Sequence, residues 1–365
     1  MKKYWHGENY KRFHKKRSER SWKKKLRFKN YRKTENQKKL FVSKKQRAIE
    51  HSIRSQASKF SPTAEIVHAP QTMCFLLKPE EMTSFIDKLE SCEQRRIPVY
   101  VDLSAVERLK LNAITVLLSV MVRFKSSKVK FTGNLPINPT ARSGLVESKF
   151  FEHLKVQFKR SKNYDLLGST IYTHGKLKVD PEFSDQLIGD AATTVWGESR
   201  RCQGMQLAFV ELMQNTNNHA SSQQGEHHYW ISLHHVQSEN RVVFTFVDFG
   251  VGIFESLSAK KPGDKFYDIL QKMWNTIGED RTRMLRNIFN GKLHKTSTGK
   301  SFRGKGLPAL HKAFRENKIS KLAMVTNNVF YNSQDDTYVQ LKKNFSGTMI
   351  TWELNESNES KPRIY

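Results

Sequence analysis

The chain has 365 residues, which is enough for two domains with extensions. Its hydrophobic fraction of 37% allows buried cores, but no apolar run approaches the ~20 residues that a membrane-spanning helix needs. Cys74, Cys92 and Cys202 lack the spacing of a metal site or a disulfide framework, and no hydrophobic signal segment opens the chain. These features argue against a disulfide-stapled or membrane-spanning protein, and we expect a cytoplasmic one.

The net charge of +28 is concentrated near the N-terminus, where residues 1–60 hold 22 Lys or Arg and four Glu. Residues 1–45 are too charged to form a core, and a helix is expected over 37–59. Seven aromatic residues lie between the cations: Tyr4, Trp5, Tyr10, Phe13, Trp22, Phe28 and Tyr31. Because cations neutralise phosphates and aromatic rings stack on bases, this basic arm (residues 1–60) is predicted to bind DNA or RNA. An acidic protein partner or an anionic membrane surface are the alternatives.

Residues 61–150 alternate short apolar strands with longer helical patterns. Strands are expected at 74–78, 99–106 and 129–134, and helices at 80–95 and 111–127. This alternation predicts a small α/β domain.

The stretch "VYVDLSAVERLKLNAITVLLSV", residues 99–120, resembles the central strand, turn and helix of a STAS domain, the fold of anti-sigma antagonists. In signalling members of that family a phosphorylatable serine opens the helix. Here Asn112 and Thr115 are nearest to that place and no serine matches. The resemblance therefore implies a STAS-like fold for residues 61–150 without the phosphorylation switch.

Residues 151–197 are weakly patterned and are interpreted as a connector with some strand content. A long helix is expected at 199–220 and strands at 228–236 and 240–250. Four short strands are expected later, at 321–328, 329–332, 337–343 and 347–354. Residues 198–357 are thus predicted to place one layer of helices on a mostly antiparallel sheet.

The segment "ELMQNTNNHA", residues 211–220, concentrates amides beside one carboxylate. On a helix, Glu211 and Asn215 share a face, with Asn218 and His219 one turn further on. Mg²⁺ prefers oxygen ligands and keeps several waters, so one carboxamide can suffice to hold it, and a neighbouring carboxylate can deprotonate a water. Taken alone, the pattern also fits a solvated polar helix face.

Two glycine-containing stretches follow. Asp248 ends an apolar strand and is followed by Gly250 and Gly252, which lets a carboxylate meet a base amino group while the backbone passes close to the ring. Gly304 and Gly306 open a helix, where exposed backbone amides and the helix dipole favour phosphate.

In this order the segments resemble those of the GHKL ATPases, which include gyrase, the heat-shock chaperone, mismatch-repair MutL and histidine kinases. Residues 211–220 resemble the N box, 248–253 the G1 box, 304–310 the G2 box, and 347–354 the terminal strand. The resemblance covers about residues 198–355 and implies a Bergerat fold, a two-layer α/β sandwich that binds ATP and Mg²⁺.

By this resemblance Glu211 is the general base, Asn215 the Mg²⁺ ligand, and Asp248 the partner of the adenine amino group with Thr348 beside it. The further implied ATP contacts are Asn218, His219, Gly250, Gly252, Lys300, Arg303, Gly304, Lys305, Gly306 and Leu307. The family places a mobile ATP lid between its last two boxes, where Arg281, Arg283, Lys300 and Arg303 are candidates for the γ-phosphate.

Two histidine patterns are weaker signals. His227, His228, His234 and His235 surround one strand, but no cysteine or carboxylate completes a metal set, and adjacent residues of a strand face opposite ways. His51 lacks the neighbours of a histidine-kinase phosphoacceptor.

Three functions remain open. The first is an ATP-dependent switch or slow ATPase that controls a protein partner or a homodimer and is tethered to nucleic acid by the basic arm. The second is a protein serine kinase regulator resembling the anti-sigma kinases. The third is a non-catalytic nucleotide- or nucleic-acid-binding adaptor.

Overall fold

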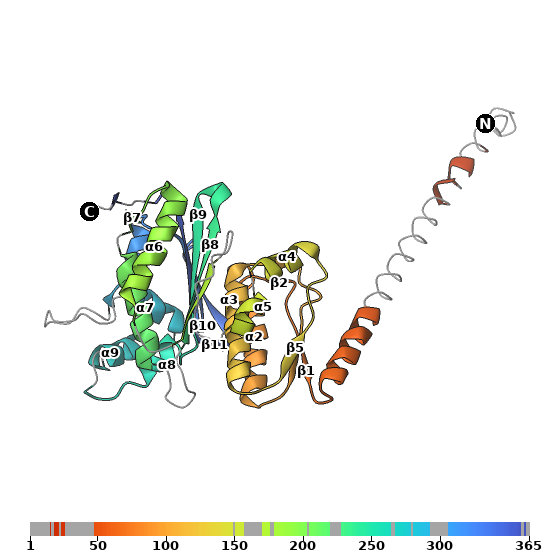
Figure 1. The fold of residues 1–365 in the computed structure, drawn as a ribbon, viewed down its shortest axis with the longest axis horizontal. Coiled ribbons are helices and arrows are strands. Elements are labelled where there is room, and N and C mark those ends of the chain that lie inside the picture. The colour runs from red at the N-terminus through yellow and green to blue at the C-terminus, as the bar shows by residue number, and fades with distance from the viewer. Residues whose placement is uncertain are drawn as a thin grey trace, which may run out of the picture. The chain divides into compact units, whose positions relative to one another are not determined.

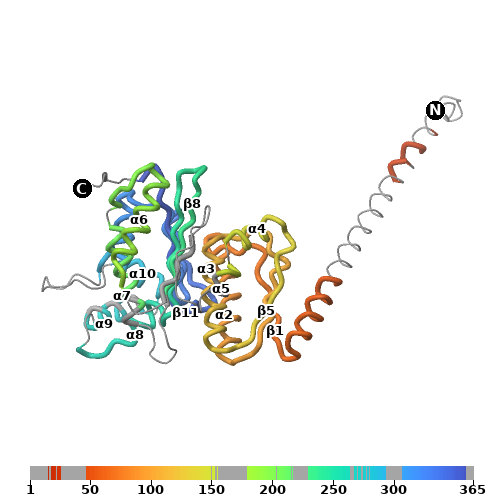
Figure 2. The backbone as a smooth tube through the Cα atoms, in the orientation of Figure 1, coloured from red at the N-terminus to blue at the C-terminus, as the bar shows by residue number. Residues whose placement is uncertain are grey.

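The fold is taken from a computed structural model, drawn in Figures 1 and 2. It describes residues 15, 18–21, 23–25, 47–148, 150–156, 170–175, 179–202, 204–219, 228–263, 267–278, 280–292, 306–358 and 361–362. The chain divides into two compact units, Met1–Pro62 and Thr63–Tyr365. Residues 47–60 of the first unit are helical, which agrees with the later part of the helix expected at 37–59. Residues 37–46 lie outside the described residues.

The second unit begins with a parallel three-stranded sheet, here called the small sheet. It consists of β1 (Glu65–His68), β3 (Val99–Asp102) and β5 (Phe131–Gly133), with β3 in the centre. Parallel neighbours require crossover connections, which α2 (Pro79–Gln94) and α3 (Leu111–Ser126) supply. The short strands β2 (Thr72–Met73), before α2, and β4 (Arg108–Leu109), before α3, pair in parallel. After β5 come α4 (Pro139–Glu147) and α5 (Phe150–Val156).

The prediction of a strand at residues 74–78 is wrong. These residues form a turn in which the amide of Lys78 donates to the carbonyl of Cys74 at 2.9 Å, and α2 starts directly afterwards at Pro79. Proline suits the first helical turn because its missing amide would have no partner there. Cys74 and Phe75 are nevertheless buried, so the apolar run marked burial and not a strand.

An antiparallel five-stranded sheet, here called the large sheet, follows with strand order β10-β11-β9-β8-β6. Its strands are β6 (Thr170–Gly175), β8 (His228–Val236), β9 (Arg241–Asp248), β10 (Ser320–Asn332) and β11 (Thr337–Asn355). The four short strands expected after residue 320 are two long ones, because register shifts at Asn327 interrupt the apolar pattern without ending β10.

Residues 151–197, expected to be a connector, contribute β6 at the sheet edge and α6 (Pro181–Trp196) to the core. The helix expected at 199–220 is α7 (Met205–His219), preceded by β7 (Arg200–Arg201), which pairs with β12 (Lys361–Pro362). The remaining elements are η1 (Gln237–Glu239), α8 (Ile253–Ser258), α9 (Tyr267–Ile277), α10 (Arg281–Phe289) and α11 (Gly306–Arg315).

Both faces of the large sheet are covered. One face packs against α6, α7, α10 and α11, whereas the opposite face joins one core with α2 and α3, as Figure 1 shows. The second unit is therefore a mixed α/β structure with successive layers of helices, sheet, helices and sheet. This explains why α3 is apolar around most of its circumference: it lies between two sheets.

No helix in the described part of the chain has the length and apolar character to cross a bilayer. Cys74, Cys92 and Cys202 are buried and none forms a disulfide.

Candidate nucleotide site

Asp248 stands at the carboxyl end of β9, in register with Thr348 of β11 and Tyr229 of β8. Side chains alternate along a strand, and Phe244 and Phe246 belong to the core beneath α6 and α7, so Asp248 faces the same helix layer. Its Oδ1 accepts a hydrogen bond from the Gly250 amide at 2.9 Å. Burial raises the pKa of this carboxyl to about 6, against the opposing effect of the Gly250 bond.

The loop after Asp248 is held by two residues of β10. The Thr326 hydroxyl accepts from the Ile253 amide at 3.1 Å. The Asn327 side chain accepts from the Phe254 amide at 3.0 Å and donates to the Val251 carbonyl at 2.9 Å. Asn327 thereby satisfies one donor and one acceptor of the loop backbone.

Gly252 is the point of closest approach in this loop. Its φ is +78°, and a Cβ there would lie 2.4 Å from the Asn327 side chain. A side chain at position 252 would therefore push away the residue that holds the loop. Gly252 was expected from sequence, whereas Thr326 and Asn327 were not. An Asn-Asn pair inside an apolar strand pattern was the available signal, because asparagine is depleted in regular strands.

The strand facing Asp248 is equally close. Gly347 has a φ of +102°, and a Cβ on it would lie 2.0 Å from the Asp248 carbonyl oxygen. The next residue, Thr348, is buried, with its hydroxyl 3.2 Å from that of Thr326. Thr326 also donates to the Gly347 carbonyl at 3.1 Å. The structure thus brings Asp248 and Thr348 together in register.

Glu211 lies on α7 and is only 4% exposed. It meets the start of α11: a Cβ added to Gly306 would lie 2.5 Å from the Glu211 Cβ. The first turn of α11 can therefore approach α7 because residue 306 is a glycine. Leu307, the next residue, is buried in the core between α7 and the large sheet.

Several expected residues cannot be placed in this site. Asn215 is on α7 one turn after Glu211, but the side chains of Asn215, Asn218 and His219 lie outside the described residues. Lys300, Arg303, Gly304 and Lys305 lie outside them entirely.

Of the arginines considered for the γ-phosphate, Arg281 begins α10 and is engaged locally. Its guanidinium contacts Glu255 at 3.1 Å and Asn328 at 3.0 Å, and it lies 5.5 Å from the Phe254 ring centre. Arg283 is largely exposed, 4.0 Å from Asp280. Arg281 therefore supports the loop that follows Asp248.

Of the four strand histidines, His234 and His235 have described side chains. His235 Nδ1 lies 2.6 Å from the Thr194 hydroxyl, and burial lowers the pKa of both His234 and His235. Among the described residues no three His, Cys, Asp or Glu side chains form a group that could bind a metal. His227 and the side chain of His228 lie outside those residues.

The two residues nearest to the place where the resemblance would put a phosphorylatable serine, Asn112 and Thr115, are buried. Thr115 is fully buried, with its hydroxyl 2.9 Å from both the Leu111 carbonyl and the Ser232 hydroxyl of β8. Asn112 is also buried, at 5% exposure. Neither side chain is accessible to a kinase in this arrangement.

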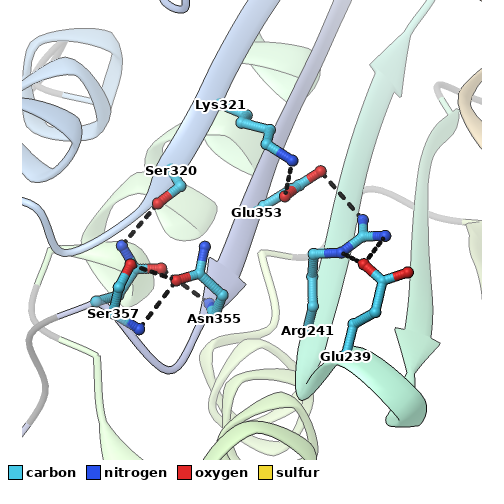
Figure 3. A network of polar contacts seen from close by, with 8 residues as sticks. Glu239, Arg241, Ser320, Lys321, Glu353, Asn355 and Ser357 are labelled. Carbon is cyan, nitrogen blue, oxygen red and sulfur yellow. Dashed lines mark hydrogen bonds and ion pairs between the residues drawn. The ribbon is translucent and has the colours of Figure 1, made fainter.

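The end of the large sheet remote from Asp248 is closed by a charged network, shown in Figure 3. Arg241, the first residue of β9, contacts Glu239 at 2.8 Å and Glu353 at 3.2 Å, and Lys321 contacts Glu353 at 2.9 Å. These opposite charges compensate one another, so the network stabilises this end of the large sheet.

Comparison with protein-family models finds none that matches this chain, and comparison with curated proteins finds no matching relative.

Proposed function

We propose that the chain binds ATP with Mg²⁺ between α7, the loop after β9 and the start of α11, and acts as an ATP-dependent switch or slow ATPase of the GHKL class. The observation that carries this proposal is the pairing of Asp248 with Thr348 at a strand end walled by Gly252 and Gly347. Because the Gly250 amide occupies Oδ1, Oδ2 of Asp248 is the atom that would accept from an adenine amino group. Thr348 would hold the other edge of the ring, and the large sheet would be that of a Bergerat fold.

The phosphates would lie toward α11. α11 begins at Gly306, and its start, with a further glycine at 304 in the sequence, would offer backbone amides and the positive end of the dipole to phosphate oxygens. Lys300, Arg303 and Lys305 would add positive charge, and Asn218 and His219 would line the same side. Asn215 would hold Mg²⁺ through its carbonyl oxygen. Glu211, buried beside the first turn of α11, would orient and deprotonate the attacking water.

The test is binding and hydrolysis of Mg·ATP by the purified full chain, with Glu211→Gln and Asp248→Asn beside it. We expect wild type to bind and hydrolyse, Glu211→Gln to bind without turnover, and Asp248→Asn to lose binding. Wild type that binds no adenine nucleotide contradicts the proposal. Binding with no hydrolysis and equal behaviour of Glu211→Gln selects the non-catalytic adaptor.

We propose further that the basic arm tethers the protein to nucleic acid, on the strength of its 22 Lys or Arg with interleaved aromatic residues. Deletion of residues 1–60 should abolish binding to single-stranded RNA and duplex DNA probes and remove the salt dependence that phosphate contacts create. Unchanged binding by the truncated protein contradicts a role for the arm. Comparing the two probes decides between RNA and DNA.

The serine kinase alternative has weaker support, because Thr115 of the STAS-like region is buried against β8. It predicts transfer of the γ-phosphate to another protein. ATP consumption without labelled protein in a lysate excludes it.

A further inference from the structure

The two chain segments that form the expected base site rest on the same group of residues in α2 and α3. Phe249 directly follows Asp248, and Ser346 comes two residues before Thr348. The guanidinium of Arg123 on α3 lies 5.3 Å from the centre of the Phe249 ring. Ser346 hydrogen-bonds to Glu90 on α2, which is the ion-pair partner of Arg123.

Arg123 is the centre of a buried ion cluster. Its two terminal nitrogens contact Glu90 at 2.7 Å and Glu93 at 2.9 Å, and the Ser127 hydroxyl donates to Glu93. The two glutamate side chains are 5% and 6% exposed and Arg123 is 22% exposed. Burial raises the pKa of Glu90, while the Arg123 charge and the Ser346 and Arg123 hydrogen bonds oppose that rise. The geometry of this cluster is fixed, because displacing Arg123 or either glutamate would leave a buried charge without its partner.

Apolar and backbone contacts extend the same support along β11. Phe345 lies with its ring centre 5.6 Å from that of Phe249 and 5.8 Å from that of Phe75. The Lys342 amide donates to Glu80 at 3.1 Å, and Lys343 contacts Asp87 of α2 at 3.1 Å.

The pairing of β11 with β10 is irregular at this place. Asn327 pairs with Phe345, whereas Val329, only two residues away, pairs with Gln340. The additional residues of β11 between these two pairs contact α2 through Lys342 and Lys343. The backbone of β11 that leads to Thr348 is therefore held by contacts outside the large sheet.

We infer that Arg123 is a positioning residue for the base site, through which the STAS-like layer sets nucleotide affinity. Arg123 holds Phe249 by its ring and, through Glu90, holds Ser346. It therefore fixes the backbones that carry Asp248 and Thr348 without touching the nucleotide. Coupling of this kind is reciprocal, so bound nucleotide tightens the contact of α2 and α3 with the large sheet by the same factor. The inference rests on the proposed ATP binding.

The test compares Arg123→Lys with Arg241→Lys in the full chain. Lysine keeps the positive charge between the two glutamates but cannot bridge both with a planar fork or stack equally well on Phe249. Arg241 is a matched control: it is also 22% exposed and paired with two glutamates, but it lies at the opposite end of β9 (Figure 3). Two probes are titrated, Mg·ATP and Mg·tripolyphosphate, which lacks the base.

We expect Arg123→Lys to weaken Mg·ATP binding about tenfold or more, within the usual range of coupling between sites, with tripolyphosphate binding and kcat at saturating ATP within about twofold of wild type. Phe249→Leu should weaken ATP binding similarly, and the double variant should lose little more than either single one, because both remove the same contact. Arg241→Lys should bind both probes as wild type does.

Three results overturn the inference without contradicting the proposed binding of ATP by the wild-type protein. They are unchanged ATP affinity in Arg123→Lys, equal loss for ATP and tripolyphosphate, and an equal loss in Arg241→Lys. Wild type that binds tripolyphosphate but no ATP refutes the base site itself, and the role of Arg123 falls with it.

Discussion

Asp248→Asn should make the ligand-free protein more stable at neutral pH while strongly weakening its affinity for ATP. The substitution keeps the shape of the side chain and the hydrogen bond from the Gly250 amide, because asparagine retains Oδ1 as an acceptor. What it removes is the charge of a carboxyl whose pKa is raised from 3.8 to about 6.

The size of the stability change follows from this pKa. A rise of about two units corresponds to about 3 kcal/mol at 1.36 kcal/mol per unit, and we expect about 1–3 kcal/mol because Asp248 is only partly buried. The folded protein binds this proton more tightly than the unfolded chain does. The contribution of Asp248 to folding is therefore fully present below the unfolded pKa and is lost as the pH rises through about 6.

The loss of ATP affinity has a different cause. With Oδ1 committed to the Gly250 amide, the new Nδ2 occupies the position of Oδ2 and directs a donor at the adenine amino group, which is itself a donor. A missing hydrogen bond to a charged acceptor and an unmatched donor together should weaken binding about a hundredfold or more.

Asp102→Asn is the matched control. Asp102 also ends a strand, and its Oδ1 accepts from the amide two residues on, that of Ser104, at 3.0 Å. Burial acts to raise its pKa, but hydrogen bonds from Asn134, His68 and Ser104 hold the pKa of this carboxyl below its usual value. Its stabilisation is present above the unfolded pKa and lost as the pH falls through the folded pKa, so Asp102→Asn should destabilise the protein at neutral pH.

The assay is urea unfolding of both variants and wild type at about pH 5 and about pH 8, beside ATP titration. Asp248→Asn should gain stability over wild type at the higher pH and about half as much at the lower, because a pH of about 5 lies between the unfolded and the folded pKa of Asp248. A loss of stability in Asp248→Asn at the higher pH, or unaltered ATP affinity, refutes the reasoning.

Three further outcomes test the site. Gly306→Ala should lose about 1–3 kcal/mol of unfolding free energy, because its Cβ would lie 2.5 Å from that of Glu211, whereas Gly144→Ala on α4, with nothing within 4 Å, should be neutral or stabilising in the same urea titration. Asn327→Ala should cost about 1–3 kcal/mol by leaving the buried Phe254 amide without its partner, and unchanged amide exchange at Phe254 contradicts this. Glu211→Gln should keep ATP affinity within about twofold while phosphate release falls about a hundredfold or more; equal turnover removes Glu211 as the base.

The sequence predicted the regular parts of the fold better than its irregular parts. The helical spacing of α3 and the alternation along β8 gave the right elements because period and burial agree there. The run 74–78 was misread because an apolar turn and an apolar strand have the same composition. β10 and β11 were each divided in two because Asn327 and Gly347 interrupt strand patterns locally while the ladder continues.

For the candidate site, the sequence indicated residues whose side chains or glycine backbone are distinctive, such as Asp248, Gly252 and Thr348. It did not indicate Asn327 or Arg123, because each acts through a partner distant in the chain: Val251 and Phe254 for the first, Phe249 and Glu90 for the second. Local spacing contains no information about such pairs.

Because α3 lies between two sheets, the second unit is difficult to divide into fragments that fold by themselves. A fragment starting at residue 198 would expose the sheet face that carries Trp230, Val247 and Met349, all of which are buried in the core shared with α3. Such a fragment would associate or precipitate, because an uncovered apolar sheet face of this kind is a site of aggregation. Residues 63–358 should instead melt in one cooperative transition, and a stable truncated protein should begin before β1 and retain both sheets.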